Sequence, residues 1–177
     1  MPIETLRPNA AGDLTELSQT PASGSTYDKV DEATIDDTDY VSNESATPGA
    51  WQTDLYNMAP LSVTSGTITQ VKLYIRERYY AASGYPWAGG SGGYSIKTNG
   101  VQYNTAIGIL SSWTSVTATW ATNPQTGIAW TIAEVNALQI GAYLKTSPSN
   151  NGGADDNHPR NSHLYIEVTA TPATAAV

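Results

Sequence analysis

Strict alternation of apolar and polar residues marks two stretches of this chain, Thr67–Tyr80 and Ser162–Ala170, as β-strands. Side chains of a strand point alternately to its two faces, so this period of two indicates strands with one buried face. The expected inward set is Val71, Leu73, Ile75, Leu164, Ile166 and Val168. The expected outward set is Lys72, Tyr74, Arg76, Arg78, His163, Tyr165, Glu167 and Thr169.

Shorter strand candidates lie between turn residues along the rest of the chain. They are Ile3–Pro8, Leu14–Gln19, Tyr27–Asp31, Tyr40–Asn43, Trp51–Met58 and Ser112–Trp120. Asn99 and Gly100 separate two further strand-like runs, and this dipeptide favours a tight hairpin because both residues tolerate positive φ. Many short strands without a strand–helix rhythm predict an all-β fold, a single jelly-roll-like antiparallel β-sandwich.

One segment, residues 131–138, breaks the strand pattern. Thr131 followed by Glu134 has the spacing of a capping box, and Ile132, Val135 and Leu138 recur at helical intervals. The sequence therefore predicts one short helix here, packed across an open end of the sandwich.

The first fifty residues are more polar than residues 51–177, but no linker separates the two parts. We expect residues 1–50 to form polar N-terminal strands, or an arm, within the same domain as a β-sandwich body at 51–177.

Composition narrows the classes of partner. The chain has 16 Asp and Glu against 8 Lys and Arg, a net charge of −8, and the cations form no basic stripe in the sequence. Nucleic acid is therefore not expected as a partner. There is no Cys, no secretory signal at the start, and no apolar run near the roughly 20 residues that a membrane span needs.

The segment Thr122–Leu144, TNPQTGIAWTIAEVNALQIGAYL, resembles a segment of jelly-roll proteins from tailed bacteriophages. ETLRPNAAGDLTEL, YDKVDEATIDDTDYVSNES and VKLYIRERY are similar to other parts of the same proteins. The resemblance implies a non-enzymatic virion structural protein, assembled in the host cytoplasm. Within that class it favours a capsid decoration (cement) protein that binds and stabilises the head lattice, with capsid or other virion proteins as partners and a homo-oligomer, a trimer, as the expected state. The alternative is a tail or fibre component, or a carbohydrate-binding (receptor-binding) β-sandwich module.

An aromatic, glycine-rich loop at residues 79–94 is the candidate contact site. Its rings suit either stacking on a sugar or filling a neighbour's pocket. The residues are Tyr79, Tyr80, Tyr85 and Trp87. The structural alternative is a long hairpin loop that tucks its Trp onto its own sandwich.

Carboxylate side chains are the second group of candidate site residues, for metal binding or catalysis. Asp36, Asp37 and Asp39 are the candidate ligands for a calcium ion, which prefers several oxygen ligands, although the spacing is not that of an EF-hand. The alternative is a solvated turn, and no other cofactor is expected. Glu77, Glu134 and Glu167 do not stand out as a catalytic pair, and no GxSxG motif is present, so the sequence does not predict an enzyme.

Overall fold

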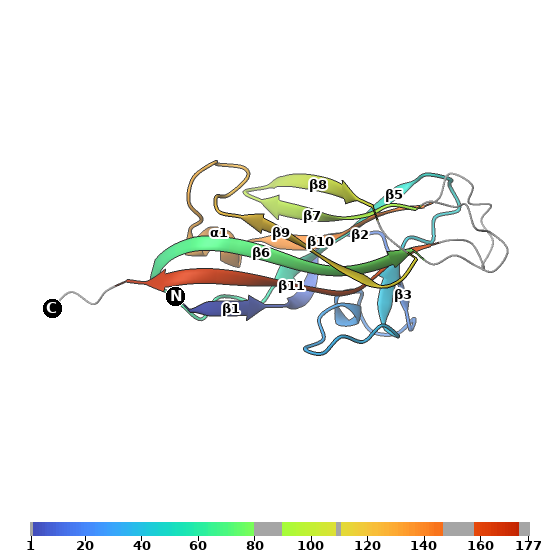
Figure 1. Ribbon diagram of the computed structural model, residues 1–177, viewed down its shortest axis with the longest axis horizontal. Coiled ribbons are helices and arrows are strands. Elements are labelled where there is room, and N and C mark those ends of the chain that lie inside the picture. Colours follow the sequence, from blue (N-terminus) through green and yellow to red (C-terminus); the bar gives the residue numbers. More distant parts are fainter. Residues whose placement is uncertain (1, 80–89, 109–110, 147–157, 174–177) are drawn as a thin grey trace.

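The computed structural model describes residues 2–79, 90–108, 111–146 and 158–173, which fold into two antiparallel sheets packed face to face (Figure 1). Sheet A contains, in spatial order, β3 (Ser18–Thr20), β4 (Tyr40–Ser42), β11 (Pro159–Pro172), β6 (Gly66–Tyr79) and β9 (Thr114–Trp120), with β1 (Ile3–Leu6) also paired to β11. Sheet B contains β2 (Pro8–Thr15), β5 (Trp51–Met58), β10 (Gln139–Lys145), β7 (Gly92–Thr98) and β8 (Val101–Ile107).

The strand order confirms the predicted fold class. The last eight strands run β4–β11–β6–β9 in sheet A and β5–β10–β7–β8 in sheet B. Apart from the β7–β8 hairpin, consecutive strands from β4 to β11 thus alternate between the sheets, in the order of a jelly roll, which consists of two Greek keys. The first three strands extend the two sheets, and they do so by pairing with β11, β5 and β4.

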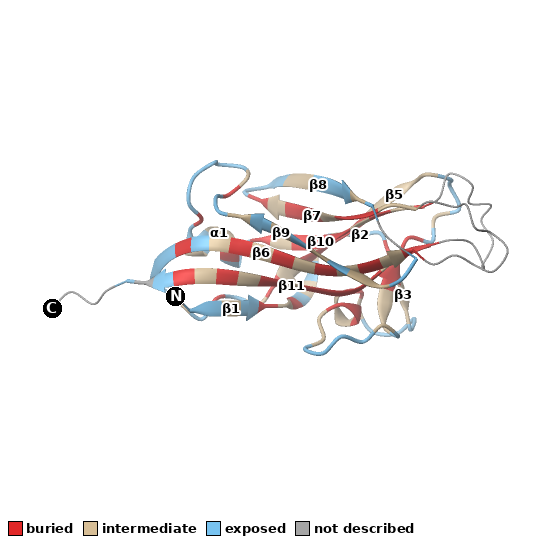
Figure 2. Ribbon diagram, viewed as in Figure 1, coloured by how far each residue is buried: buried red, intermediate tan, exposed pale blue. Residues whose placement is uncertain are grey.

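The long central strands β6 and β11 carry the predicted alternation, visible in Figure 2 as bands of buried and less buried residues. All six residues of the expected inward set are buried, at 1% exposure or less. Each fully buried aliphatic side chain of this kind contributes about 1.5–3 kcal/mol relative to an exposed one. Tyr74, Arg76 and Tyr165 point outward and are only half-buried.

The predicted helix forms as α1 (Ile132–Asn136), with both hydrogen bonds of the capping box present between Thr131 and Glu134. It is shorter than expected because the chain leaves helical geometry at Ala137, although Leu138 is still buried. Trp130 is buried just ahead of it and donates its indole N–H to the carbonyl of Trp120, 3.3 Å away. The helix therefore fills one end of the sandwich (Figure 1).

The segment that begins at Tyr27 and packs against sheet A differs from two expectations from the sequence. The sequence predicts a strand over Tyr27–Asp31, but Tyr27–Lys29 forms a 3-10 helix, η1. The backbone after it reaches β11, where the Leu164 N–H donates to the Val30 carbonyl. This segment also buries His163, which the alternation places on the surface and which is only 7% exposed.

Among the described residues, no helix is both long enough and apolar enough to cross a membrane. Asn99 and Gly100 both have positive φ, at 49° and 78°, and connect β7 to β8 in the tight turn that the sequence predicts.

Candidate functional site

The predicted aromatic contact site is only partly within the described residues. Tyr79 ends β6 on its inward side and is 8% exposed, because it packs beside the backbone of Gly90. Its ring is therefore not on the surface as the sequence suggested. Tyr80, Tyr85 and Trp87 lie outside the described residues, so their role stays a prediction.

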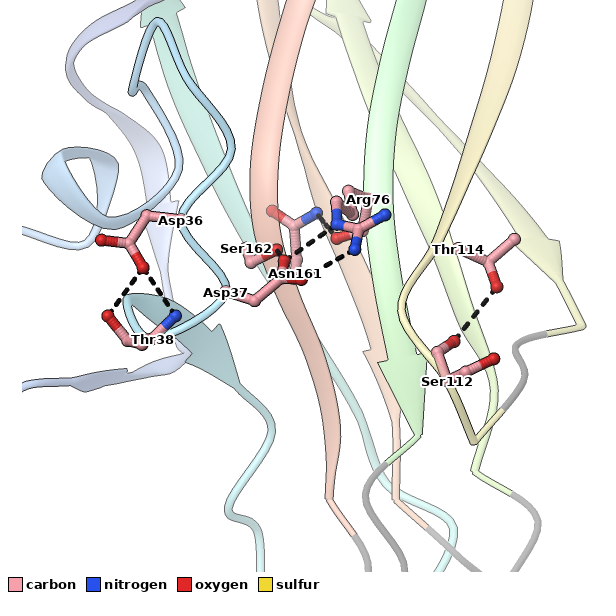
Figure 3. A network of polar contacts seen from close by, with 8 residues as sticks. All are labelled: Asp36, Asp37, Thr38, Arg76, Ser112, Thr114, Asn161 and Ser162. Carbon is pink, nitrogen blue, oxygen red and sulfur yellow. Dashed lines mark hydrogen bonds and ion pairs between the residues drawn. The ribbon is translucent and has the colours of Figure 1, made fainter.

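The three candidate calcium ligands each contact a different partner, and Figure 3 shows two of them, Asp36 and Asp37. Asp36 accepts hydrogen bonds from the backbone N–H and hydroxyl of Thr38. Asp37 forms a two-point ion pair with Arg76 at 2.7 and 2.8 Å, and Lys29 approaches Asp39 at 3.4 Å. Within the described ranges no group of three or more acidic or His side chains is arranged to hold a metal ion. The Asp37–Arg76 hydrogen bonds instead lower the pKa of Asp37 and fasten the loop onto sheet A.

The three glutamates considered for catalysis lie in three separate environments. Glu77 is fully buried inside the sandwich, and burial raises its pKa well above the ordinary value. Glu134 caps α1, and Glu167 accepts a hydrogen bond from the Tyr74 hydroxyl on the outer surface of sheet A. These residues do not face one another across a shared site, so they do not form a glycosidase pair.

The outer surface of sheet A gathers cations and is here named the basic face. It is formed by outward side chains of β6, β11 and β9, with Arg7 and Trp113 at its margins. Five cations lie on it: Arg7, Lys72, Arg76, Arg78 and Arg160.

The aromatic rings at the centre of the basic face form a stack that is closed at both ends. Tyr74 and Tyr165 are directly opposite in the β6–β11 pairing, and their rings stack at 4.6 Å with an angle of 7°. Lys72 Nζ lies 4.5 Å from the Tyr74 centroid, and the Arg7 guanidinium lies 5.1 Å from that of Tyr165. The flat faces of both rings are therefore occupied by neighbours in this protein.

The second aromatic group on the basic face has the same character. Trp113 lies near two guanidinium groups, those of Arg76 at 5.9 Å and Arg78 at 5.4 Å from its ring centroid. Tyr40 is tilted against Trp113 at 6.4 Å and has the Arg160 guanidinium 4.4 Å from its own ring. Here too cations lie close to the aromatic rings, at distances typical of cation–π contacts.

The outer surface of sheet B differs and is here named the amide face. At one end, Trp51 of β5 and Tyr143 of β10 stack at 3.9 Å with an angle of 6°. Lys145 Nζ approaches the Trp51 ring at 5.6 Å. Among the described residues, no second ring or cation covers the other face of Tyr143. The Tyr143 ring itself is half-buried.

Amide side chains occupy the other end of the amide face. Gln139 is at the centre, where its amide donates to Asp13 and Asn57 at 3.1 and 3.2 Å. Lys97 forms an ion pair with Asp13, and this hydrogen bond lowers the pKa of Asp13. Further toward the sheet edge, Gln102 donates to Asn104 at 2.8 Å. An amide carries both a donor and an acceptor, so this end can match the hydroxyl groups of a sugar.

Glycines connect the two ends of the amide face. Gly141 of β10 and Gly93 of β7 both point outward, between inward-facing neighbours. A Cβ on Gly141 would lie 1.6 Å from the Asp54 carbonyl oxygen, and one on Gly93 would lie 2.1 Å from that of Thr105. Neighbouring backbone thus crowds the outer side at both positions, and only glycine fits. Backbone atoms of Asp54 and Thr105 therefore lie close to these two glycines, between the aromatic pair and the amides.

Sequence reasoning missed Trp51, Tyr143 and the amide group. Trp51 opens the predicted strand Trp51–Met58, and Tyr143 lies between the inward residues Ala142 and Leu144. The period of two places Tyr143 outward, which is a signal that the sequence contains. Their pairing depends on the β5–β10 register, which connects residues about ninety positions apart and leaves no local trace.

The comparisons with known proteins return solved structures of low similarity. No protein-family model and no curated protein matches the sequence. Among solved structures, the xylan-binding CBM22-1 domain of Paenibacillus barcinonensis Xyn10C is 12% identical, with a TM-score of 0.43, and the match covers 95% of this chain and 88% of that one. A family 35 carbohydrate-binding module from an environmental isolate is 12% identical at a TM-score of 0.37, covering 97% and 98%.

A third similar structure, TmCBM61 in complex with β-1,4-galactotriose, is 8% identical at a TM-score of 0.38, covering 93% of this chain and 87% of that one. Likeness at these values does not establish a ligand, so function has to be inferred from the surface of this chain. The resemblance to phage proteins finds no counterpart among these three structures, all of which are carbohydrate-binding modules.

Proposed function

We propose that this protein is a glycan-binding β-sandwich that contacts a neutral polysaccharide through its amide face. The observation that carries this proposal is the half-buried Tyr143 ring, which is stacked on Trp51, has no second ring or cation against it among the described residues, and shares its face with a group of amide side chains. The proposal takes up the carbohydrate-binding alternative from the sequence and moves its site from the 79–94 loop to sheet B.

The chemistry of the face suits a sugar chain. A pyranose has apolar C–H faces that stack on an aromatic ring, and hydroxyl edges that need paired donors and acceptors. Tyr143 and Gln139 are four residues apart on β10, a distance of roughly 13 Å at strand geometry. This distance is long enough for a ligand of more than one sugar unit to contact the Tyr143 ring and the amide side chains together.

Assignment to a virion, as a cement protein, trimer or fibre component, continues to rest on the sequence resemblance alone. It is compatible with glycan binding if the chain is a receptor-binding module. No described surface feature independently favours a capsid lattice, so we do not propose that role as the primary one.

The test is a binding screen of the purified chain against xylan, β-glucan, mannan and galactan, followed by calorimetry on oligosaccharides of the best one. We expect a Kd in the micromolar to millimolar range. Replacing Tyr143 with alanine should weaken binding about tenfold or more, because it removes the stacking ring. Circular dichroism of the variant would verify that the sandwich remains folded.

Tyr74→Ala is the matched control, because it removes one member of a stacked aromatic pair from the basic face. Neutral glycan affinity should stay at the wild-type value in this variant. Equal losses in both variants, or wild-type affinity in Tyr143→Ala, would remove the amide face from consideration. An absence of binding to all four polysaccharides would count against neutral glycans as the ligand.

A further inference from the structure

We infer that strand β8, at the edge of sheet B, is an interaction surface that pairs antiparallel with the β8 strand of a second copy of this chain. The resulting dimer would join sheet B of the two copies into one continuous sheet. The inference concerns contact between copies, so it goes beyond the proposed function and can fail independently of it.

The edge strands on the two sides of the sandwich differ in how they are protected. A free edge presents unpaired N–H and C=O groups, and proteins protect it with short strands, bulges, charged residues or proline. On one side, β1 and β3 are four and three residues long, and β2 carries Asp13 and two register shifts against β5. On the other side, β8 and β9 each have seven residues in continuous register, with no charged residue and no proline.

The two unprotected edges lie on the same side of the sandwich. Tyr94 of β7, the strand next to β8, makes an edge-to-face contact with Trp120 of β9 at 5.7 Å. Within the described ranges, β8 pairs with β7 alone and β9 pairs with β6 alone. This side of the molecule therefore presents two strands that can each accept a further strand.

Apolar side chains that β8 and β9 direct toward the core are incompletely covered. Tyr103 and Trp120 pack against the core but are only partly buried, and Val101, which alternates with Tyr103, is 40% exposed. By contrast, Val41 of β4 and Tyr56 of β5, toward the opposite side, are 0% exposed. A second strand beside β8 would remove more of this apolar surface from water.

The β7–β8 hairpin determines which backbone groups of β8 are available. Thr98 and Val101 flank its two-residue turn and are the last pair in its register. The flanking pair of such a hairpin is hydrogen-bonded, and hydrogen-bonded pairs then alternate with non-hydrogen-bonded ones. The N–H and C=O groups of Gln102, Asn104 and Ala106 therefore point away from β7, toward the free edge.

These three residues are centred on the strand, which makes the edge complementary to itself. A two-fold axis at Asn104, the middle residue of β8, would pair Asn104 with Asn104 of the second copy and Gln102 with Ala106. All three pairs are then hydrogen-bonded, and an amide provides both donors and acceptors to an identical amide. On the inward side, Val101 would lie opposite Ile107 of the second copy.

The charge of the chain favours this edge as the contact between copies. Each copy carries a net charge of −8, so two copies repel one another, and an uncharged strand is where close approach costs least. Lys97, which is opposite Gln102 on β7, is already paired with Asp13. A contact along one seven-residue strand, about 23 Å long, is small for a specific interface, so we expect a dimer with a micromolar Kd.

The test is sedimentation velocity of the purified chain from about 1 to 100 μM, where a micromolar dimer dissociates on dilution. We expect the wild type to shift from monomer to dimer over this range. Thr105→Lys should weaken dimerisation about tenfold or more, because the dimer would bury this lysine beside Tyr103 of the second copy. In the monomer the same lysine reaches water, since Thr105 is exposed.

Thr117→Lys is the matched control, because it makes the same change at the middle of β9, the other unprotected edge. This variant should dimerise like the wild type. Ala106→Pro provides a second disruption, since it removes an N–H from the free edge and not from the β7 ladder. Circular dichroism would verify that each variant is folded. A wild type that stays monomeric at every concentration, or a dimer weakened by Thr117→Lys as much as by Thr105→Lys, would overturn the inference.

The dimer has one consequence that rests on the proposed function. Residues paired across the two-fold axis point to the same side of a sheet, so both amide faces would lie on one surface. Long polysaccharide should then bind the wild type more tightly than Thr105→Lys, while a short oligosaccharide binds both equally. A dimer that binds no glycan would refute only the amide face, and a monomer that binds glycan through Tyr143 would refute only the β8 contact.

Discussion

The two outer faces of this sandwich each carry stacked aromatic rings, yet they use them in opposite ways. On the basic face the Tyr74–Tyr165 pair is closed by cations at both ends. On the amide face the Trp51–Tyr143 pair is closer, at 3.9 Å, and among the described residues a cation lies near Trp51 but not near Tyr143. An aromatic pair on a strand surface therefore indicates a stacking site only where a ring face stays uncovered.

The surroundings of the pairs reinforce this difference. The basic face is flanked by guanidinium groups, and the acidic loop around Asp37 fastens onto it. The amide face is flanked by Gln139 and Asn57, with glycine between these amides and the rings. The rings of the basic face are therefore surrounded by charged groups, and those of the amide face by amides and glycine.

The largest expected effect, on stability, comes from adding a methyl group at Gly141 on the amide face. Gly141→Ala would place a methyl group on the carbonyl oxygen of Asp54, so β5 and β10 would have to separate. We expect a loss of about 3 kcal/mol in the free energy of unfolding, measured by denaturant titration. Gly108→Ala is the control, because a Cβ there meets no atom within 4 Å. Similar stability of the two variants would show that the backbone around Gly141 can shift to accept a methyl group.

A smaller effect should separate the two aromatic pairs. Double-mutant cycles with Leu replacements should give a coupling of about 1 kcal/mol within each pair, because both are stacked within 7° of parallel. Saturating neutral glycan should then increase the Trp51–Tyr143 coupling and leave that of Tyr74–Tyr165 unchanged. A glycan effect on the second pair would show that the distinction between open and closed rings is wrong.

The sequence predicted the features that depend on neighbours along the chain. The period of two in β6 and β11 and the Thr131–Glu134 capping box each lie within a few residues, and both appear in the structure. The features that it could not predict depend on long-range pairing. Arg7 and Arg160 reach the basic face only through the β1–β11 and β11–β6 registers, so five cations that look dispersed in the sequence converge on one surface.

The smallest expected effect is a pH response that differs in sign between the two faces. Burial raises the pKa of Glu32, at the margin of the basic face, from 4.5 to about 7. The folded protein thus keeps a proton that the unfolded chain releases, and this contribution to stability is lost as pH rises through that window. On the amide face, the pKa of Asp13 is lowered from 3.8 by Lys97, so its contribution is lost as pH falls through that lower pKa.

Difference curves isolate these two groups, because buried Asp54 and Glu77 also have raised pKa values and respond with the same sign as Glu32. Thermal unfolding from pH 3 to pH 8 would be measured for the wild type, Glu32→Gln and Asp13→Asn. The wild type should lose stability relative to Glu32→Gln between about pH 4.5 and pH 7, while its difference from Asp13→Asn stays flat there and changes only below about pH 4. Parallel curves for the wild type and Glu32→Gln would show that the Glu32 carboxylate is solvated, and the segment over sheet A would then be held mainly by Asp37 and Arg76.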